Sequence, residues 1–121
     1  MIEVYADRIG DKCRLLAQGH ADKGPECDVV CAGVSALVQS LLIYAKAHPA
    51  LRRRLRYYAA PGEAFFSCCG IGEGFELVLQ GLRAIAQDYE ENLVIHTQSQ
   101  LTTNERKRDI IKHGEGCATL A

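Results

Sequence analysis

The sequence has few of the residues that mark specialised classes of protein. Its 121 residues include no tryptophan, one methionine and three prolines, and 48% are hydrophobic, so the composition is neither disordered nor fibrous. Neither sign of charge is in excess. The 14 basic and 15 acidic residues give a net charge of −1, which argues against nucleic-acid binding through overall positive charge. The length predicts one globular domain.

Long apolar runs are also missing. The longest, residues 34–47, is interrupted by four polar residues and is too short to span a bilayer. Residues 1–5 begin as structure, without the basic region and apolar core of a signal peptide. We therefore expect a cytoplasmic protein with no membrane contact.

Cysteine, in contrast, is abundant, with six residues. Thiols stay reduced in the cytoplasm, so a disulfide framework is not expected. Buried packing accounts for most of the six, and at least one of them is a candidate for chemistry.

The hydrophobic pattern predicts an α+β domain with the element order ββαββαβ and mainly antiparallel pairing. We expect strands at residues 2–7, 12–19, 53–60, 64–69 and 93–97, and helices at residues 28–48 and 75–89. In this prediction Asp28 caps the first helix and Pro49 ends it. Residues 98–121 lose periodicity and are expected to form a polar tail.

One local arrangement carries the means for nucleophilic chemistry. His20 stands at the end of a predicted strand, and Cys31 stands in the first turn of the predicted long helix. Backbone N–H groups at a helix start stabilise negative charge on a thiol or an oxyanion, and a neighbouring imidazole can take the thiol proton. The competing interpretation is that Cys31 simply packs in the helix.

The motifs around these two residues are specific enough to compare with a known family. Gly-His-Ala at residues 19–21 and Asp-Val-Val-Cys-Ala-Gly-Val-Ser at residues 28–35 resemble the Prp family of ribosomal-processing cysteine proteases. The resemblance covers residues 1–97 and implies two helices on one face of a five-stranded sheet. It also implies a homodimeric endopeptidase that removes the N-terminal extension of large-subunit ribosomal protein twenty-seven. We expect no cofactor and no metal site.

The resemblance also implies roles for individual residues. Cys31 matches the nucleophile and His20 the general base. Asp28 matches the acidic residue before the cysteine; helix capping is its favoured role, and orienting His20 is the weaker option. Ser35 matches the hydroxyl residue of the motif and is assigned no catalytic step.

A loop joins the two motifs and is the predicted substrate loop. It is about one residue shorter than is usual in the family, and its glycine is expected to let it close over a peptide. Its residues are Asp22, Lys23, Gly24, Pro25 and Glu26.

Cys27 leaves several interpretations open. With Cys31 and His20 it supplies three potential zinc ligands, although no fourth lies close in the sequence. It is otherwise a bystander thiol, or a partner that forms a disulfide with Cys31 under oxidation.

Two further alternatives concern partners. Arg52, Arg53, Arg54 and Arg56 form the one basic concentration, which is either a solvated strand edge or a contact for ribosomal RNA. The competing class of function is a non-catalytic module that binds a peptide or the ribosome in the same cleft.

Overall fold

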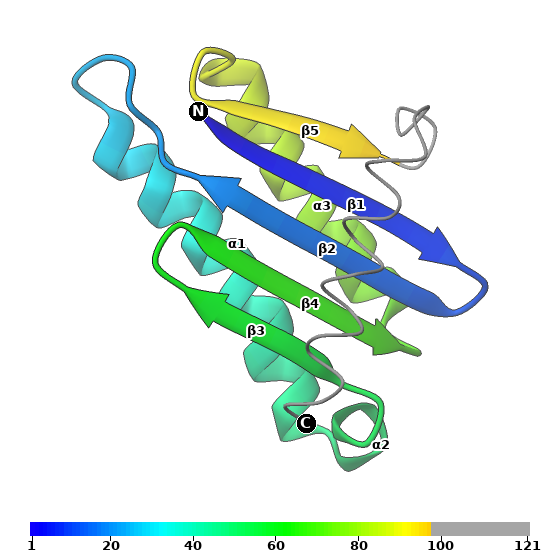
Figure 1. Ribbon diagram of the computed structural model, residues 1–121. Coiled ribbons are helices and arrows are strands. Elements are labelled where there is room, and N and C mark those ends of the chain that lie inside the picture. The colour runs from blue at the N-terminus through cyan, green and yellow to red at the C-terminus, as the bar shows by residue number, and fades with distance from the viewer. Residues whose placement is uncertain (98–121) are drawn as a thin grey trace.

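The domain is built on one five-stranded sheet. The computed structural model describes residues 1–97, so the predicted tail at residues 98–121 lies outside the described residues. The strands are β1 (Ile2–Ile9), β2 (Lys12–Gly19), β3 (Arg56–Ala60), β4 (Glu63–Cys69) and β5 (Leu93–Thr97), and their order across the sheet is β3-β4-β2-β1-β5. Only β5 runs parallel to its neighbour, β1, and the other pairs are antiparallel (Figure 1). The predicted α+β class is confirmed.

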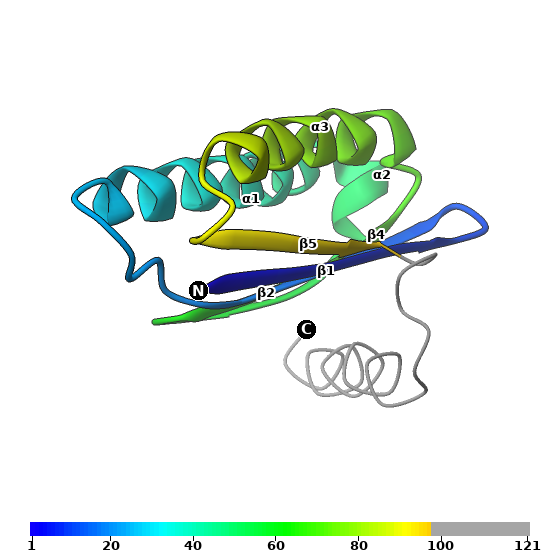
Figure 2. The same ribbon diagram turned by 90° about the horizontal axis from the view of Figure 1, so that it is seen from above.

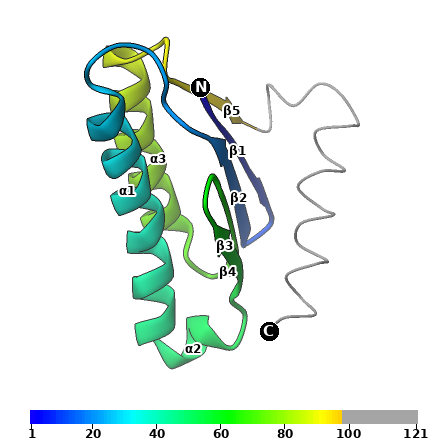
Figure 3. The same cartoon turned by 60° about the vertical axis from the view of Figure 1, so that its left-hand side comes forward.

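Two long helices cover one face of this sheet. Helices α1 (Cys27–Ala47) and α3 (Gly72–Asp88) lie side by side on it (Figures 2 and 3). Successive side chains of a strand point to opposite faces of the sheet, and those on the inward face meet the helices. The resulting core includes the fully buried Val4, Leu15 and Phe66 from the strands, and Val30 and Leu82 from the helices.

The helix boundaries correct two predictions about α1. The helix begins at Cys27 and has Glu26 at its N-cap position, so Asp28 lies within the first turn and does not cap it. Pro49 ends α1 as predicted, but it also starts a short helix, α2 (Pro49–Arg52). Proline suits this place because the first helical residue needs no N–H donor.

The short helix delays the next strand. The sequence predicts residues 53–55 in that strand, but β3 begins only at Arg56. The backbone N–H groups of Arg53 and Arg54 instead donate to carbonyls of α2 and complete its turns. Helix α3 begins earlier than residue 75, since Gly72, Glu73 and Gly74 form its first turn, where the Phe75 N–H donates to the Ile71 carbonyl (2.9 Å).

By length and composition, α1 is the one helix among the described residues that is long and apolar enough to cross a membrane. In the fold its apolar residues Val30, Val34, Val38 and Leu41 are buried against the sheet. The side that points away from the core carries Ile43, which is 65% exposed.

The other face of the sheet holds a second, smaller buried cluster. Leu16 and Phe65 are buried there. Arg14 donates two hydrogen bonds to the Asp7 carboxylate (2.8 and 2.7 Å), and both side chains are more than 90% buried. A bidentate pair of this kind satisfies both charges without water.

Candidate active site

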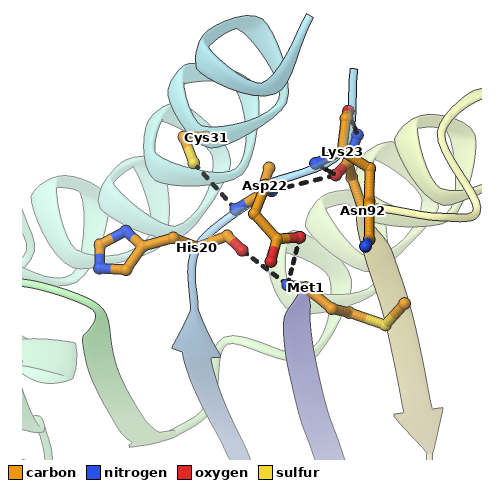
Figure 4. Close-up of polar contacts among 7 residues, drawn as sticks. Met1, His20, Asp22, Lys23, Cys31 and Asn92 are labelled. Carbon is orange, nitrogen blue, oxygen red and sulfur yellow. Dashed lines mark hydrogen bonds and ion pairs between the residues drawn. The ribbon is translucent and has the colours of Figure 1, made fainter.

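His20 lies where two turns meet at one end of the sheet. The strand β2 ends at Gly19, whose N–H donates to the Gly62 carbonyl in the β3–β4 turn (2.8 Å). The exposed imidazole of His20 rests on Gly62, since a Cβ there would lie 2.7 Å from Nε2. In Figure 4 the ring extends away from Asp22 and Met1. Gly62 has a φ of +75°, which glycine adopts without strain.

Cys31 approaches the same place from α1. It is the fifth residue of the helix and lies two residues further from the N-cap than predicted, because Glu26 and not Asp28 stands at the N-cap position. Its half-buried Sγ accepts a hydrogen bond from the Ala21 N–H (3.4 Å; Figure 4). The residue directly after His20 therefore contacts the sulfur.

A cavity of about 220 Å³ joins the two side chains. Cys31 and Ser35 line it from α1, and His20 lines it from the end of β2. Apolar and aromatic side chains form most of the remaining wall, among them Val38, Leu42, Tyr57, Tyr58 and Phe66. The structure thus brings His20, Cys31 and Ser35 together, although the described residues show no hydrogen bond between the imidazole and the thiol.

The first half of the predicted substrate loop is held in place by Asn92. The Asn92 side-chain oxygen accepts hydrogen bonds from the backbone N–H groups of Asp22 (3.2 Å) and Lys23 (2.9 Å), and its amide donates to the Lys23 carbonyl (2.8 Å; Figure 4). The Met1 amino group donates to the His20 carbonyl (2.7 Å), and its hydrogen bond to Asp22 lowers the pKa of that carboxyl. The loop is therefore fixed immediately after His20.

The second half is more open. Gly24 and Pro25 are exposed, and no atom lies within 4 Å of a Cβ built on Gly24. At the end of the loop, hydrogen bonding to the Glu26 carboxylate raises the pKa of the Tyr89 phenol. Tyr89 follows α3, so both ends of the loop contact the same turn between α3 and β5.

Asp28 neither caps the helix through its side chain nor lines the cavity. It is exposed in the first turn of α1, where its charge interacts favourably with the helix dipole. Among the described residues, no hydrogen bond or ion pair joins Asp28 to His20, so the structure gives no support to the weaker option that Asp28 orients His20.

The thiols differ in their surroundings. Cys27 and Cys31 are both half-buried free thiols. Within residues 1–97, no group of three or more His, Cys, Asp and Glu side chains is arranged to hold a metal ion. Cys13 is buried in the core, and burial raises its pKa to about 11, so it stays a neutral packing residue.

Sequence reasoning did not identify Gly62 and Asn92 as parts of the site. A turn was predicted at Pro61 and Gly62, but nothing local indicated that it supports His20. Asn92 stands in an ordinary polar stretch before β5, and its partners lie 69 and 70 residues away.

Comparison with known proteins relates this geometry to a family. No curated protein matches the chain. Two crystal structures of an essential ribosomal processing protease Prp from S. aureus share its fold; one holds a substrate peptide and the other a covalently linked product peptide. They are 23% and 22% identical, cover 81% of this chain and all of their own, and have TM-scores of 0.66 and 0.68. A Streptococcus mutans protein is similar at 23% identity, with a TM-score of 0.59, and the match covers 81% of this chain and 96% of that one.

The family assignment comes from the sequence model of one family. The model described as cysteine protease Prp matches residues 1–94, which is most of the chain and contains every residue of the cavity. The chain therefore belongs to the Prp family of cysteine proteases.

Proposed function

We propose that this protease cuts a peptide bond with Cys31 as nucleophile and His20 as general base. The observation that carries the proposal is that both side chains line one cavity, while the backbone next to His20 contacts the Cys31 sulfur. A backbone N–H directed at sulfur stabilises negative charge that develops there. We expect the hydrogen bond between His20 and the Cys31 thiol to form when the peptide binds, since catalytic hydrogen bonds often tighten only with substrate present.

The proposed reaction is ordinary acyl transfer. His20 takes the proton of Cys31, and the sulfur attacks the peptide carbonyl to form a tetrahedral oxyanion. The intermediate collapses as His20 protonates the leaving amine, which gives a thioester on Cys31. Water, deprotonated by His20, then hydrolyses the thioester and restores the thiol.

The cavity supports a substrate with an apolar side chain near the cut. Its wall is largely apolar and aromatic, with Val38, Leu42 and Tyr57 among the lining residues. A peptide that places such a side chain in the cavity holds its carbonyl beside Cys31, and this fixes the reacting groups.

We propose the N-terminal extension of large-subunit ribosomal protein twenty-seven as the substrate and the cytoplasm as the place of action. The likeness to a ribosomal processing protease whose structure holds a substrate peptide supports this choice. The test is incubation of the full chain with a peptide that spans the extension junction. Wild type is expected to cut it once, and Cys31→Ala and His20→Ala are expected to lose cleavage.

The same assay separates the proposal from its main alternative. A wild-type protein that binds the peptide without cutting it contradicts the protease mechanism and supports a non-catalytic binding module. Cleavage that survives in Cys31→Ala contradicts the assignment of the nucleophile.

The proposal extends to partners other than the peptide. The exposed Arg52, Arg53 and Arg54 lie together at α2, and the neighbouring Lys46 ammonium stands over the Tyr57 ring (4.5 Å). This local patch supports a contact with ribosomal RNA, which a net charge of −1 does not. We also propose a homodimer. The RNA contact is tested by changing Arg52, Arg53 and Arg54 to Glu, which is expected to abolish RNA binding. The homodimer is tested by the mass of the protein in analytical sedimentation.

A further inference from the structure

Asn92 is a buried polar residue that neither the core nor the proposed chemistry uses. It lies between α3 and β5 and is only 4% exposed. Its side chain makes three hydrogen bonds, all to the backbone of Asp22 and Lys23. Its carbonyl accepts twice and its amide donates once, so the side chain satisfies three backbone groups of the loop.

The backbone of Asn92 is itself fixed. Its N–H donates to the Tyr89 carbonyl (2.9 Å) at the end of α3, and its carbonyl accepts from the Ile2 N–H (2.8 Å) at the start of β1. The side chain therefore starts from an anchored position. It connects α3, β1 and the loop at one point.

The segment that Asn92 holds lies next to the proposed reacting groups. Asp22 directly follows Ala21, whose N–H donates to the Cys31 sulfur, and Ala21 directly follows His20. A shift of Asp22 therefore moves both the donor to the sulfur and the backbone that carries the imidazole. After Lys23, in contrast, the exposed Gly24 and Pro25 have no comparable support among the described contacts.

We propose that Asn92 is a positioning residue for the reaction, which acts through the backbone of Asp22 and Lys23 to align His20 with Cys31. It touches no reacting atom and does not line the cavity, so its effect falls on the chemical step and not on the affinity for peptide. The proposal rests on the proposed protease function.

The first test measures the loop itself. Trypsin cleaves after Lys23, and this bond becomes accessible when the Asn92 contacts open. Each neutral hydrogen bond biases such an equilibrium about fivefold, so Asn92→Ala is expected to speed cleavage at Lys23 by about 100-fold. Val78→Ala is the control for lost packing, because Val78 is buried in α3, the helix that precedes the turn with Asn92, and makes none of the hydrogen bonds to the loop.

The second test measures the reaction. Asn92→Ala is expected to lower kcat at least tenfold while KM stays within about twofold, since a displacement near 1 Å costs on the order of 100-fold. Asn92→Asp keeps the two accepting contacts and loses the donor to Lys23, and it is expected to recover part of kcat. Val78→Ala is expected to retain wild-type kcat under conditions where the protein is folded.

The results that overturn the proposal are specific. A kcat for Asn92→Ala equal to that of Val78→Ala, or a raised KM with unchanged kcat, contradicts positioning. If wild type cuts no peptide, the proposed function fails. The positioning role of Asn92 is then tested separately by the rate at which iodoacetamide alkylates Cys31, with the alkylated residue identified by mass spectrometry. A rate changed more than threefold in Asn92→Ala but not in Val78→Ala supports positioning of the thiol, and equal rates refute it.

Discussion

Replacing Gly62 with alanine separates the position of His20 from the stability of the fold. Gly62 has a φ of +75°, and an added Cβ would lie 2.7 Å from His20 Nε2 and 3.4 Å from Cδ2 and Cε1. Contacts under 3.0 Å do not occur at a real Cβ, so the imidazole has to move. Because the ring is the end of a rotatable side chain, it moves at little cost to folding.

The size of each effect follows from this geometry. An alanine held in the left-handed region costs about 1–2 kcal/mol of stability. Gly10 is a matched control in the β1–β2 turn, since it has a φ of +63° and no atom within 4 Å of an added Cβ. Gly62→Ala and Gly10→Ala are therefore expected to lose similar stability. Only Gly62→Ala displaces His20, and a shift near 1 Å in a reacting group lowers kcat/KM on the order of 100-fold.

Urea unfolding of both variants gives the stability difference, and cleavage of the junction peptide gives kcat/KM. We expect midpoints that differ little between the two variants and activities that differ about 100-fold. Equal activities would refute the argument that contact with Gly62 sets the working position of His20. A much lower stability for Gly62→Ala alone would show that the ring does not move freely.

Two further predictions concern the core. Arg14→Ala leaves the buried Asp7 carboxylate unpaired and is expected to lower the free energy of unfolding in urea by about 3–5 kcal/mol. The double variant Arg14→Met with Asp7→Leu removes both charges and is expected to lose far less. A loss under about 1 kcal/mol for Arg14→Ala contradicts the burial of the pair. Burial raises the pKa of Cys13 from 9.0 to about 11, so the thiol ionises at lower pH in the unfolded chain than in the folded one. The stability that the buried neutral thiol contributes is therefore lost as pH rises from about 9 towards about 11. Cys13→Ala is expected to show a shallower fall in stability between pH 8 and 10, and an unchanged slope refutes this.

Much of the fold was predictable because its signals are local. Alternation along β1 and helical spacing along α1 and α3 each specify an element to within a few residues. The parallel pairing of β5 with β1 has no such signal, since it joins strands that lie about 90 residues apart in the sequence, with Ile2 opposite Leu93. Helix α2 is not predicted, because a proline after a helical run indicates a stop, although proline also suits the first turn of a helix.

The site was predictable to a different degree. The motifs around His20 and Cys31 led to two side chains that the fold places in one cavity, and their catalytic roles stay predictions. The residue type of Asp28 predicts it as the N-cap, but the structure has Glu26 at that position, two residues earlier. Gly62 and Asn92 support the site across long stretches of sequence, where no local pattern records the contact.

The most direct test of the central claim is the intact mass of the protein during turnover of the junction peptide. A thioester on Cys31 adds the mass of the N-terminal peptide fragment less one water. We expect this adduct on rapid acid quenching of wild type, located at Cys31 by fragmentation, and its absence in Cys31→Ala. Turnover without any adduct in wild type, or an adduct on Cys27, would contradict Cys31 as the nucleophile.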